Sequence, residues 1–101
     1  MRRIVLLCSA GVSTSMLVRR LEAEAARLGY ECSVSFFPAA EAKAAAEFAD
    51  ALLLAPQAGH MLAELQVKYP KVPSTIIPQA MYGSADAEAI LDLAQKTVGD
   101  Y

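Results

Sequence analysis

The residues best suited to chemistry are a cysteine and the small residues that follow it. Cys8 comes directly after the apolar run 4–7, and residues 9–15 contain only Ser, Thr, Gly, Ala and Val. Small residues of this kind let main-chain amides turn inward and approach an anion closely. A loop that leads from a strand into a helix N-terminus makes an anion-binding site. The pattern therefore predicts a thiol at the rim of a phosphate-binding loop.

Such a loop would favour two charged forms of the cysteine. Main-chain amides and the helix N-terminus stabilise a thiolate, and the same donors would stabilise a phosphoryl group bound to the sulfur of Cys8. The alternative is a buried cysteine that acts as a small hydrophobic residue at the end of a strand. The loop hydroxyls are possible donors too, although helix capping and turn formation explain each of them equally well.

The spacing after Cys8 bears on whether the chain is a phosphatase. A cysteine-dependent phosphatase needs an arginine six residues after its nucleophile, where the guanidinium clamps the phosphoryl group. That position is Thr14, and the nearest arginines, Arg19 and Arg20, fall on the predicted helix. A phosphoenzyme would form here but react poorly with water, which favours a phosphate carrier. A thiol phosphatase or reductase and a regulatory module of the same fold are the alternatives.

The other candidate ligands and nucleophiles carry weaker signals. Cys32 opens a predicted strand, about 15 Å from Cys8 at ~3.3 Å per residue, so a disulfide is excluded and Cys32 is interpreted as structural. His60 is the only histidine, and a surface position is more typical of it than proton transfer or phosphate acceptance. One histidine and two separated cysteines support no metal site. Without a nucleotide-binding glycine motif, no cofactor is expected.

Composition bounds the class of protein. The 101 residues are 55% hydrophobic and 20% charged, which predicts one compact domain over 1–101 with a packed core. The formal net charge of −2 argues against a nucleic-acid or anionic-membrane partner. No apolar run approaches the ~20 residues of a membrane span, and the apolar part of 4–8 is too short for a signal peptide. With two cysteines in no disulfide pattern, we expect a cytoplasmic protein.

Predicted strands and helices alternate along the chain. The strands cover 3–8, 31–37, 51–55 and 72–77, and the helices cover 13–28, 39–49, 58–69 and 84–98. A loop with Tyr82 and Gly83 precedes the last helix. This alternation implies a parallel sheet with right-handed crossovers and helices on both faces. The two fully apolar strands should be central, and 31–37 should form an edge because its polarity alternates.

The helices and strand ends position the candidate site. Ligands of such sheets bind beyond the carboxyl ends of the strands, so Cys8, Pro56-Gln57 and Tyr82-Gly83 should share one edge. Helical spacing predicts two inward-facing stripes, one in 13–28 and one in 58–69. Their members are Met16, Leu17, Leu21, Ala25 and Leu28 in the first, and Met61, Leu62, Leu65 and Tyr69 in the second.

The loop also has a family likeness. Residues 8–15 read Cys-Ser-Ala-Gly-Val-Ser-Thr-Ser, which resembles the loop of the enzyme IIB components of the phosphoenolpyruvate:sugar phosphotransferase system, lactose/cellobiose (chitobiose) family. Pro56-Gln57 and Tyr82-Gly83 match that family's later motifs, and the length and order of elements agree. The resemblance implies a single-domain α/β fold with a four-stranded parallel sheet of order 2-1-3-4, similar to low-molecular-weight tyrosine phosphatase.

The resemblance further implies a phosphotransferase component of sugar transport. Cys8 would be the catalytic nucleophile, taking a phosphoryl group from a phosphohistidine of enzyme IIA and passing it to a sugar, expected to be a β-linked disaccharide, held by the membrane enzyme IIC. The protein would be cytoplasmic and reach the inner face of the membrane through IIC. Gln57 and Tyr82 would border the docking surface. The phosphate-binding loop would comprise Ser9, Ala10, Gly11, Val12, Ser13, Thr14 and Ser15.

Overall fold

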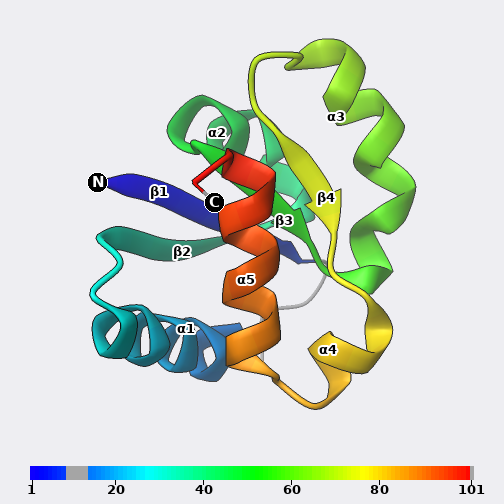
Figure 1. The fold of residues 1–101 in the computed structure, drawn as a ribbon. Helices are drawn as coiled ribbons and strands as arrows, with labels where there is room; N and C mark the ends of the chain where they lie inside the picture. The colour runs from blue at the N-terminus through cyan, green and yellow to red at the C-terminus, as the bar shows by residue number, and fades with distance from the viewer. Residues whose placement is uncertain (9–13, 101) are drawn as a thin grey trace.

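The computed structural model describes residues 1–8 and 14–100, in which a four-stranded parallel sheet forms the centre (Figure 1). Its strands are β1 (Arg2–Cys8), β2 (Cys32–Pro38), β3 (Ala51–Leu54) and β4 (Ser74–Ile76). They lie in the order β2-β1-β3-β4, and all three pairings are parallel. This order is the one that the family resemblance implies. The two strands predicted to be central, β1 and β3, are central, and β2 is an edge.

Helices cover both faces of the sheet (Figure 1). The α-helices are α1 (Thr14–Leu28), α2 (Ala42–Phe48), α3 (Leu62–Lys68), α4 (Gln79–Gly83) and α5 (Ala87–Val98), and two 3₁₀ segments, η1 (Ala39–Glu41) and η2 (Pro56–Met61), precede α2 and α3. Helices α1 and α5 pack on one face, and α2 and α3 pack on the other. Gly29 ends α1 as predicted, with a φ of 69° that a residue with a side chain rarely adopts.

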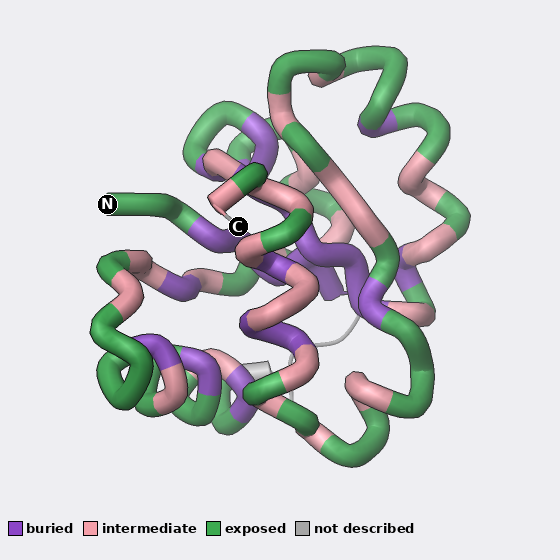
Figure 2. The backbone as a smooth tube through the Cα atoms, viewed as in Figure 1, coloured by how far each residue is buried: buried purple, intermediate pink, exposed green. Residues whose placement is uncertain are grey.

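The sheet divides the core into two clusters. Ile4 and Leu6 of β1 point toward α1 and α5, whereas Val5 and Leu7 point toward α2 and α3. All four side chains are at most 1% exposed, and buried positions run along the centre of the molecule in Figure 2. Because successive strand residues face opposite sides and both sides are covered, the buried part of this strand, residues 4–7, has no polar position.

The segment around Tyr82 and Gly83 departs from the prediction of a loop, because both residues lie in α4. A helix of five residues is too short to show an apolar period in the sequence. Pro78 stands at its N-cap, and Ala85, with a φ of 50°, separates it from α5. The last helix accordingly begins at Ala87 rather than at residue 84, capped by Asp86, whose side chain accepts a hydrogen bond from the Ala89 amide.

Two residues of the predicted inward stripe of α1 face solvent. Met16 is 58% exposed and Leu28 is 51% exposed, so their prediction as core residues is wrong. The stripe that packs on the sheet is Leu17, Leu21 and Ala25, at the i, i+4 spacing of one helix face. Met16 is turned by about 100° from Leu17, and Leu28 is the last residue of α1. The inward positions of the α3 segment are confirmed, from Met61 to Tyr69.

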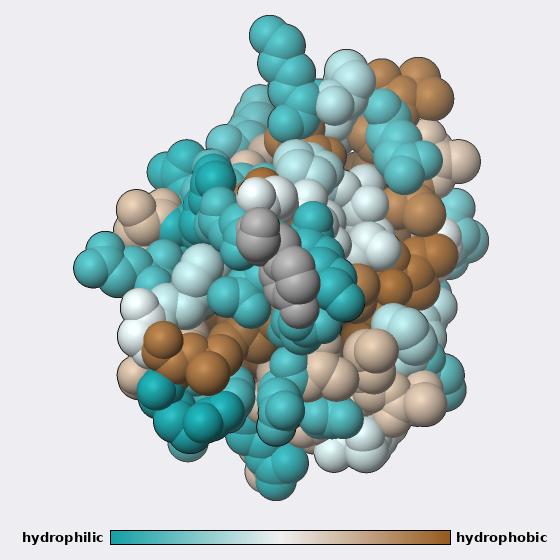
Figure 3. All heavy atoms as spheres, in the orientation of Figure 1, coloured by the Kyte–Doolittle hydropathy of each residue, from teal (hydrophilic) through white to brown (hydrophobic). Residues whose placement is uncertain are grey.

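The surface carries single exposed apolar side chains. Figure 3 shows the face in front of α5 and β4, where hydrophilic residues cover the middle and hydrophobic ones lie on the α3 side and at the lower left. Val67 of α3 is 81% exposed and Ile76 of β4 is 37% exposed. Scattered exposed apolar residues are usual in globular proteins, so they do not by themselves mark a binding site.

Candidate functional site

Cys8 is the last residue of β1 and lies where the strand order reverses. The chain leaves β1 through α1 to reach β2 on one side, and β3 pairs with β1 on the other side. Ligands of open α/β sheets bind at such a switch point, beyond the carboxyl ends of the strands. The Cys8 side chain is 2% exposed and belongs to the cluster under α1 and α5. The fold thus places the thiol at the binding edge of the sheet and largely away from bulk water.

The carboxyl ends of the neighbouring strands meet at the same edge. Cys8 is in register with Pro38 of β2. The amide of Ala55, next after β3, donates to the Leu7 carbonyl at 2.9 Å. The predicted convergence of Pro56-Gln57 with Cys8 on one edge is therefore confirmed. Gln57 lies in η2 with an exposed side chain, and its part in a docking surface stays a prediction.

The hydroxyl of Tyr82 reaches the sulfur of Cys8. It donates a hydrogen bond to Cys8 Sγ with an oxygen–sulfur distance of 3.9 Å, across 74 positions of sequence. Tyr82 is half-buried, packs against the core cluster and lines a cavity of about 120 Å³ with Met16, Leu17, Gly83 and Ala85. Sequence reasoning placed Tyr82 only at the rim. The contact with sulfur was missed because a lone tyrosine after a proline carries no local signal of its partner.

The predicted phosphate-binding loop is only partly described. Ser9, Ala10, Gly11, Val12 and Ser13 lie outside the described residues, so the predicted cradle of amides stays a prediction. Thr14 and Ser15 form the first turn of α1. Arg19 and Arg20 lie further along α1 with exposed side chains. Helix α1 therefore begins at Thr14, one residue after the predicted start of the helix that follows the loop.

The second thiol and the histidine lie apart from this site. Cys32 of β2 is in register with Arg2 of β1, which lies six residues before Cys8 along that strand. Cys32 and Cys8 are therefore separated by roughly 20 Å. Both cysteines are free, and burial raises the pKa of the Cys32 thiol, which keeps it in the less reactive neutral form. His60 is exposed in η2. Within residues 1–8 and 14–100, no three His, Cys, Asp or Glu residues group as a metal site.

Comparison with known proteins decides the family. Residues 3–93 match the model of the phosphotransferase system lactose/cellobiose-specific IIB subunit. The chain belongs to this family. As a IIB subunit it is a sugar phosphotransfer component, which confirms the resemblance found in residues 8–15. Within the described part of the IIB subunit, no helix combines the length and apolar character needed to cross a bilayer.

Two relatives support the assignment over nearly the whole chain. The IIB subunit is 32% identical over 96 residues to the oligo-beta-mannoside-specific EIIB component of Bacillus subtilis (strain 168), covering 93% of each chain. It is similar in structure to the cellobiose-specific phosphotransferase IIB component protein of Borrelia burgdorferi, whose structure was determined in solution. That similarity has a TM-score of 0.78 at 32% identity and covers 98% of this chain and 93% of the other.

Proposed function

We propose that this IIB subunit carries a phosphoryl group as phosphocysteine on Cys8. The group would come from a phosphohistidine of an enzyme IIA and go to a sugar held by a membrane enzyme IIC. The observation that carries the proposal is the position of Cys8, a 2% exposed thiol ending a central strand at the switch point of the sheet. A nucleophile at this place can meet a phosphoryl donor at the binding edge.

The proposed reaction has two transfers. In the first, the Cys8 thiolate attacks phosphorus, the S–P bond forms, the P–N bond breaks, and the imidazole of the donor keeps the electron pair. In the second, a sugar hydroxyl attacks phosphorus and gives its proton to water, the O–P bond forms, and the S–P bond breaks with its electron pair returning to sulfur. In-line attack requires that donor, phosphorus and acceptor be aligned, so positioning is the main contribution of the protein.

The arginine pattern supports a carrier rather than a hydrolase. Thr14 stands where a cysteine phosphatase has its arginine, and Arg19 and Arg20 are exposed on α1. Without a bidentate guanidinium clamp, the transition state for attack by water loses its main stabilising contact. A phosphocysteine at residue 8 would persist long enough to meet the next acceptor. Slow hydrolysis is a requirement of a carrier and a defect in a phosphatase.

The names of the relatives indicate the sugar class. One is specific for oligo-beta-mannosides and the other for cellobiose, and both are β-linked saccharides. We therefore propose a β-linked disaccharide or short oligosaccharide as the final acceptor. The IIB subunit would act in the cytoplasm, at the inner face of the membrane that holds enzyme IIC.

The decisive experiment follows phosphate on the two cysteines. The wild-type IIB subunit and the variants Cys8→Ser and Cys32→Ser are incubated with a phosphohistidine enzyme IIA of the cellobiose type and analysed by intact mass. We expect one phosphoryl group on the wild type and on Cys32→Ser, and none on Cys8→Ser. Phosphorylation retained by a folded Cys8→Ser variant would refute the proposal.

A further inference from the structure

Tyr82 is held in place by the short helix that carries it. Its own amide and that of Met81 both bond to the Pro78 carbonyl, at 3.0 and 3.1 Å. At the other end of α4, the Ala85 amide bonds to the Tyr82 carbonyl at 3.1 Å. Backbone bonds on both sides of residue 82 hold its main chain, and the ring packs against the core cluster. The position from which the hydroxyl reaches Cys8 is thus set by α4 and by this packing.

The ring of Tyr82 also belongs to the apolar surroundings of Cys8. It packs against the cluster that contains Cys8 and, together with Met16, Leu17, Gly83 and Ala85, lines the small cavity at this edge. Cys8 is buried, and Tyr82 is only partly so. A hydrogen bond in such shielded surroundings is electrostatically stronger than the same bond in water.

We propose that the Tyr82 hydroxyl stabilises the unphosphorylated thiolate of Cys8 and so sets how readily the phosphoryl group leaves. This inference rests on the proposed function, because it concerns the same sulfur. A thiolate carries a full charge and accepts a hydrogen bond strongly. The sulfur of a phosphocysteine is uncharged and is a weak acceptor. The hydroxyl therefore favours the state in which Cys8 has given its phosphoryl group away.

The direction of the effect follows from the second transfer. When the S–P bond breaks, its electron pair moves to Sγ, and the hydroxyl donates to the charge that develops there while keeping its own proton. Removal of the hydroxyl should make the sulfur a poorer leaving group. The phosphorylated IIB subunit should then become more populated at equilibrium with its donor and decay more slowly by itself.

The test compares Tyr82→Phe with the wild type, because phenylalanine keeps the ring and its packing. With a phosphohistidine enzyme IIA of the cellobiose type, the equilibrium constant for transfer to the IIB subunit should rise by about fivefold, the effect of one ordinary hydrogen bond. The purified phosphoprotein, freed of donor, should lose its phosphate about fivefold more slowly, for the same reason. An unchanged equilibrium, or a shift toward the unphosphorylated form, would overturn the inference.

The matched control is Tyr30→Phe, which removes a tyrosine hydroxyl at the opposite edge of the sheet. That hydroxyl donates to Asp100 rather than to sulfur, so both phosphoryl measurements should equal those of the wild type. If Tyr82 serves only as a docking contact, Tyr82→Phe will slow transfer from enzyme IIA but leave the decay of the isolated phosphoprotein unchanged. That result would also reject the inference.

Failure of the inference can be told apart from failure of the proposed function. If Cys8→Ser is still phosphorylated, the phosphocysteine proposal itself falls. If Cys8 alone is phosphorylated and Tyr82→Phe behaves as the wild type, only the role of Tyr82 is wrong. A thermal unfolding curve of Tyr82→Phe, expected to be close to that of the wild type, verifies that the comparison concerns a folded protein.

Discussion

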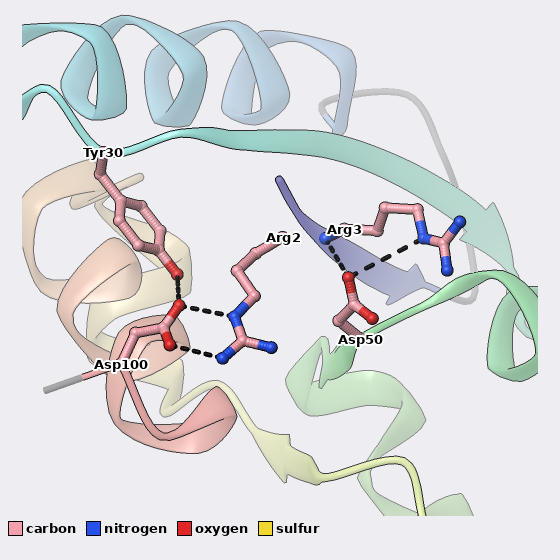
Figure 4. A network of polar contacts seen from close by, with 5 residues as sticks. All are labelled: Arg2, Arg3, Tyr30, Asp50 and Asp100. Atoms are coloured by element: carbon pink, nitrogen blue, oxygen red, sulfur yellow. Dashed lines mark hydrogen bonds and ion pairs between the residues drawn. The ribbon is translucent and has the colours of Figure 1, made fainter.

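The guanidinium of Arg2 binds both carboxylate oxygens of Asp100, 98 positions away in the sequence (Figure 4). The Nε–Oδ2 and Nη2–Oδ1 distances are 2.7 and 2.6 Å. Tyr30 adds a third hydrogen bond, from its hydroxyl to Asp100 Oδ2 at 2.7 Å. The start of β1, the approach to β2 and the residues after α5 are thereby joined at the amino edge of the sheet. Cys8 lies at the opposite, carboxyl edge, so stability can be tested separately from the chemistry proposed for Cys8.

The ionised carboxylate of Asp100 should stabilise the IIB subunit at neutral pH, and this stabilisation should be lost in acid. Hydrogen bonds from Arg2 and then from Tyr30 lower the pKa of its carboxyl from 3.8 to about 2. Because the folded state holds the charged form, this stabilisation is complete above pH 3.8 and is lost as the pH falls through about 2. Asp100→Asn should therefore be less stable than the wild type at neutral pH.

Urea unfolding at several pH values checks this prediction. The difference in unfolding midpoint between the wild type and Asp100→Asn should close as the pH falls from 3.8 toward about 2. A difference that stays constant over this range would show that the ionised carboxylate of Asp100 contributes nothing to stability.

The hydroxyl of Tyr30 should affect the stability of the IIB subunit at alkaline pH. Burial, followed by the hydrogen bond to Asp100, raises the pKa of its hydroxyl above the usual 10.0. The stabilisation is complete below pH 10.0 and declines as the pH rises, because the unfolded chain then ionises first. The stability advantage of the wild type over Tyr30→Phe should shrink in alkaline urea titrations. An advantage that grows with pH would contradict this origin.

The N-cap of α5 offers a local test of stability. The Asp86 side chain accepts a hydrogen bond from the Ala89 amide at 3.1 Å. Asp86→Ala removes this acceptor and should lower the free energy of unfolding by about 1 kcal/mol. Asp86→Asn keeps an oxygen acceptor and should stay close to the wild type in the same denaturation assay. Equal losses in both variants would argue that charge, rather than capping, is what matters.

Buried apolar side chains should contribute more to the free energy of unfolding than exposed ones. Leu53 of β3 is fully buried in the cluster beneath α1 and α5. Leu53→Ala should cost about 2–5 kcal/mol, since it removes buried methyl groups and leaves a cavity. Val67→Ala, on the 81% exposed residue of α3, should change stability by about 0.5 kcal/mol or less. Denaturation of the two variants in parallel measures the contrast, and similar losses in both would count against this core assignment.

Sequence reasoning was strongest where the signal is local. The apolar run before Cys8 and the run at 51–55 predicted the two central strands, and β1 and β3 are central. Proline and glycine marked element ends, as Gly29 does after α1. It was weakest at helix ends and in short helices. Met16 and α4 show this, because an apolar residue near a helix end can turn to solvent and a five-residue helix has no period.

The amino-acid sequence by itself determined the α/β class, the order of the strands and of the longer helices, the family and a thiol at the carboxyl end of a buried strand. Each of these follows from patterns within a few residues or from one contiguous motif. Only the tertiary structure decided that the Tyr82 hydroxyl lies 3.9 Å from Cys8 Sγ and that Arg2 pairs with Asp100. Such contacts join distant segments, and their partners are set by how the crossovers bring the ends of strands and helices together in space.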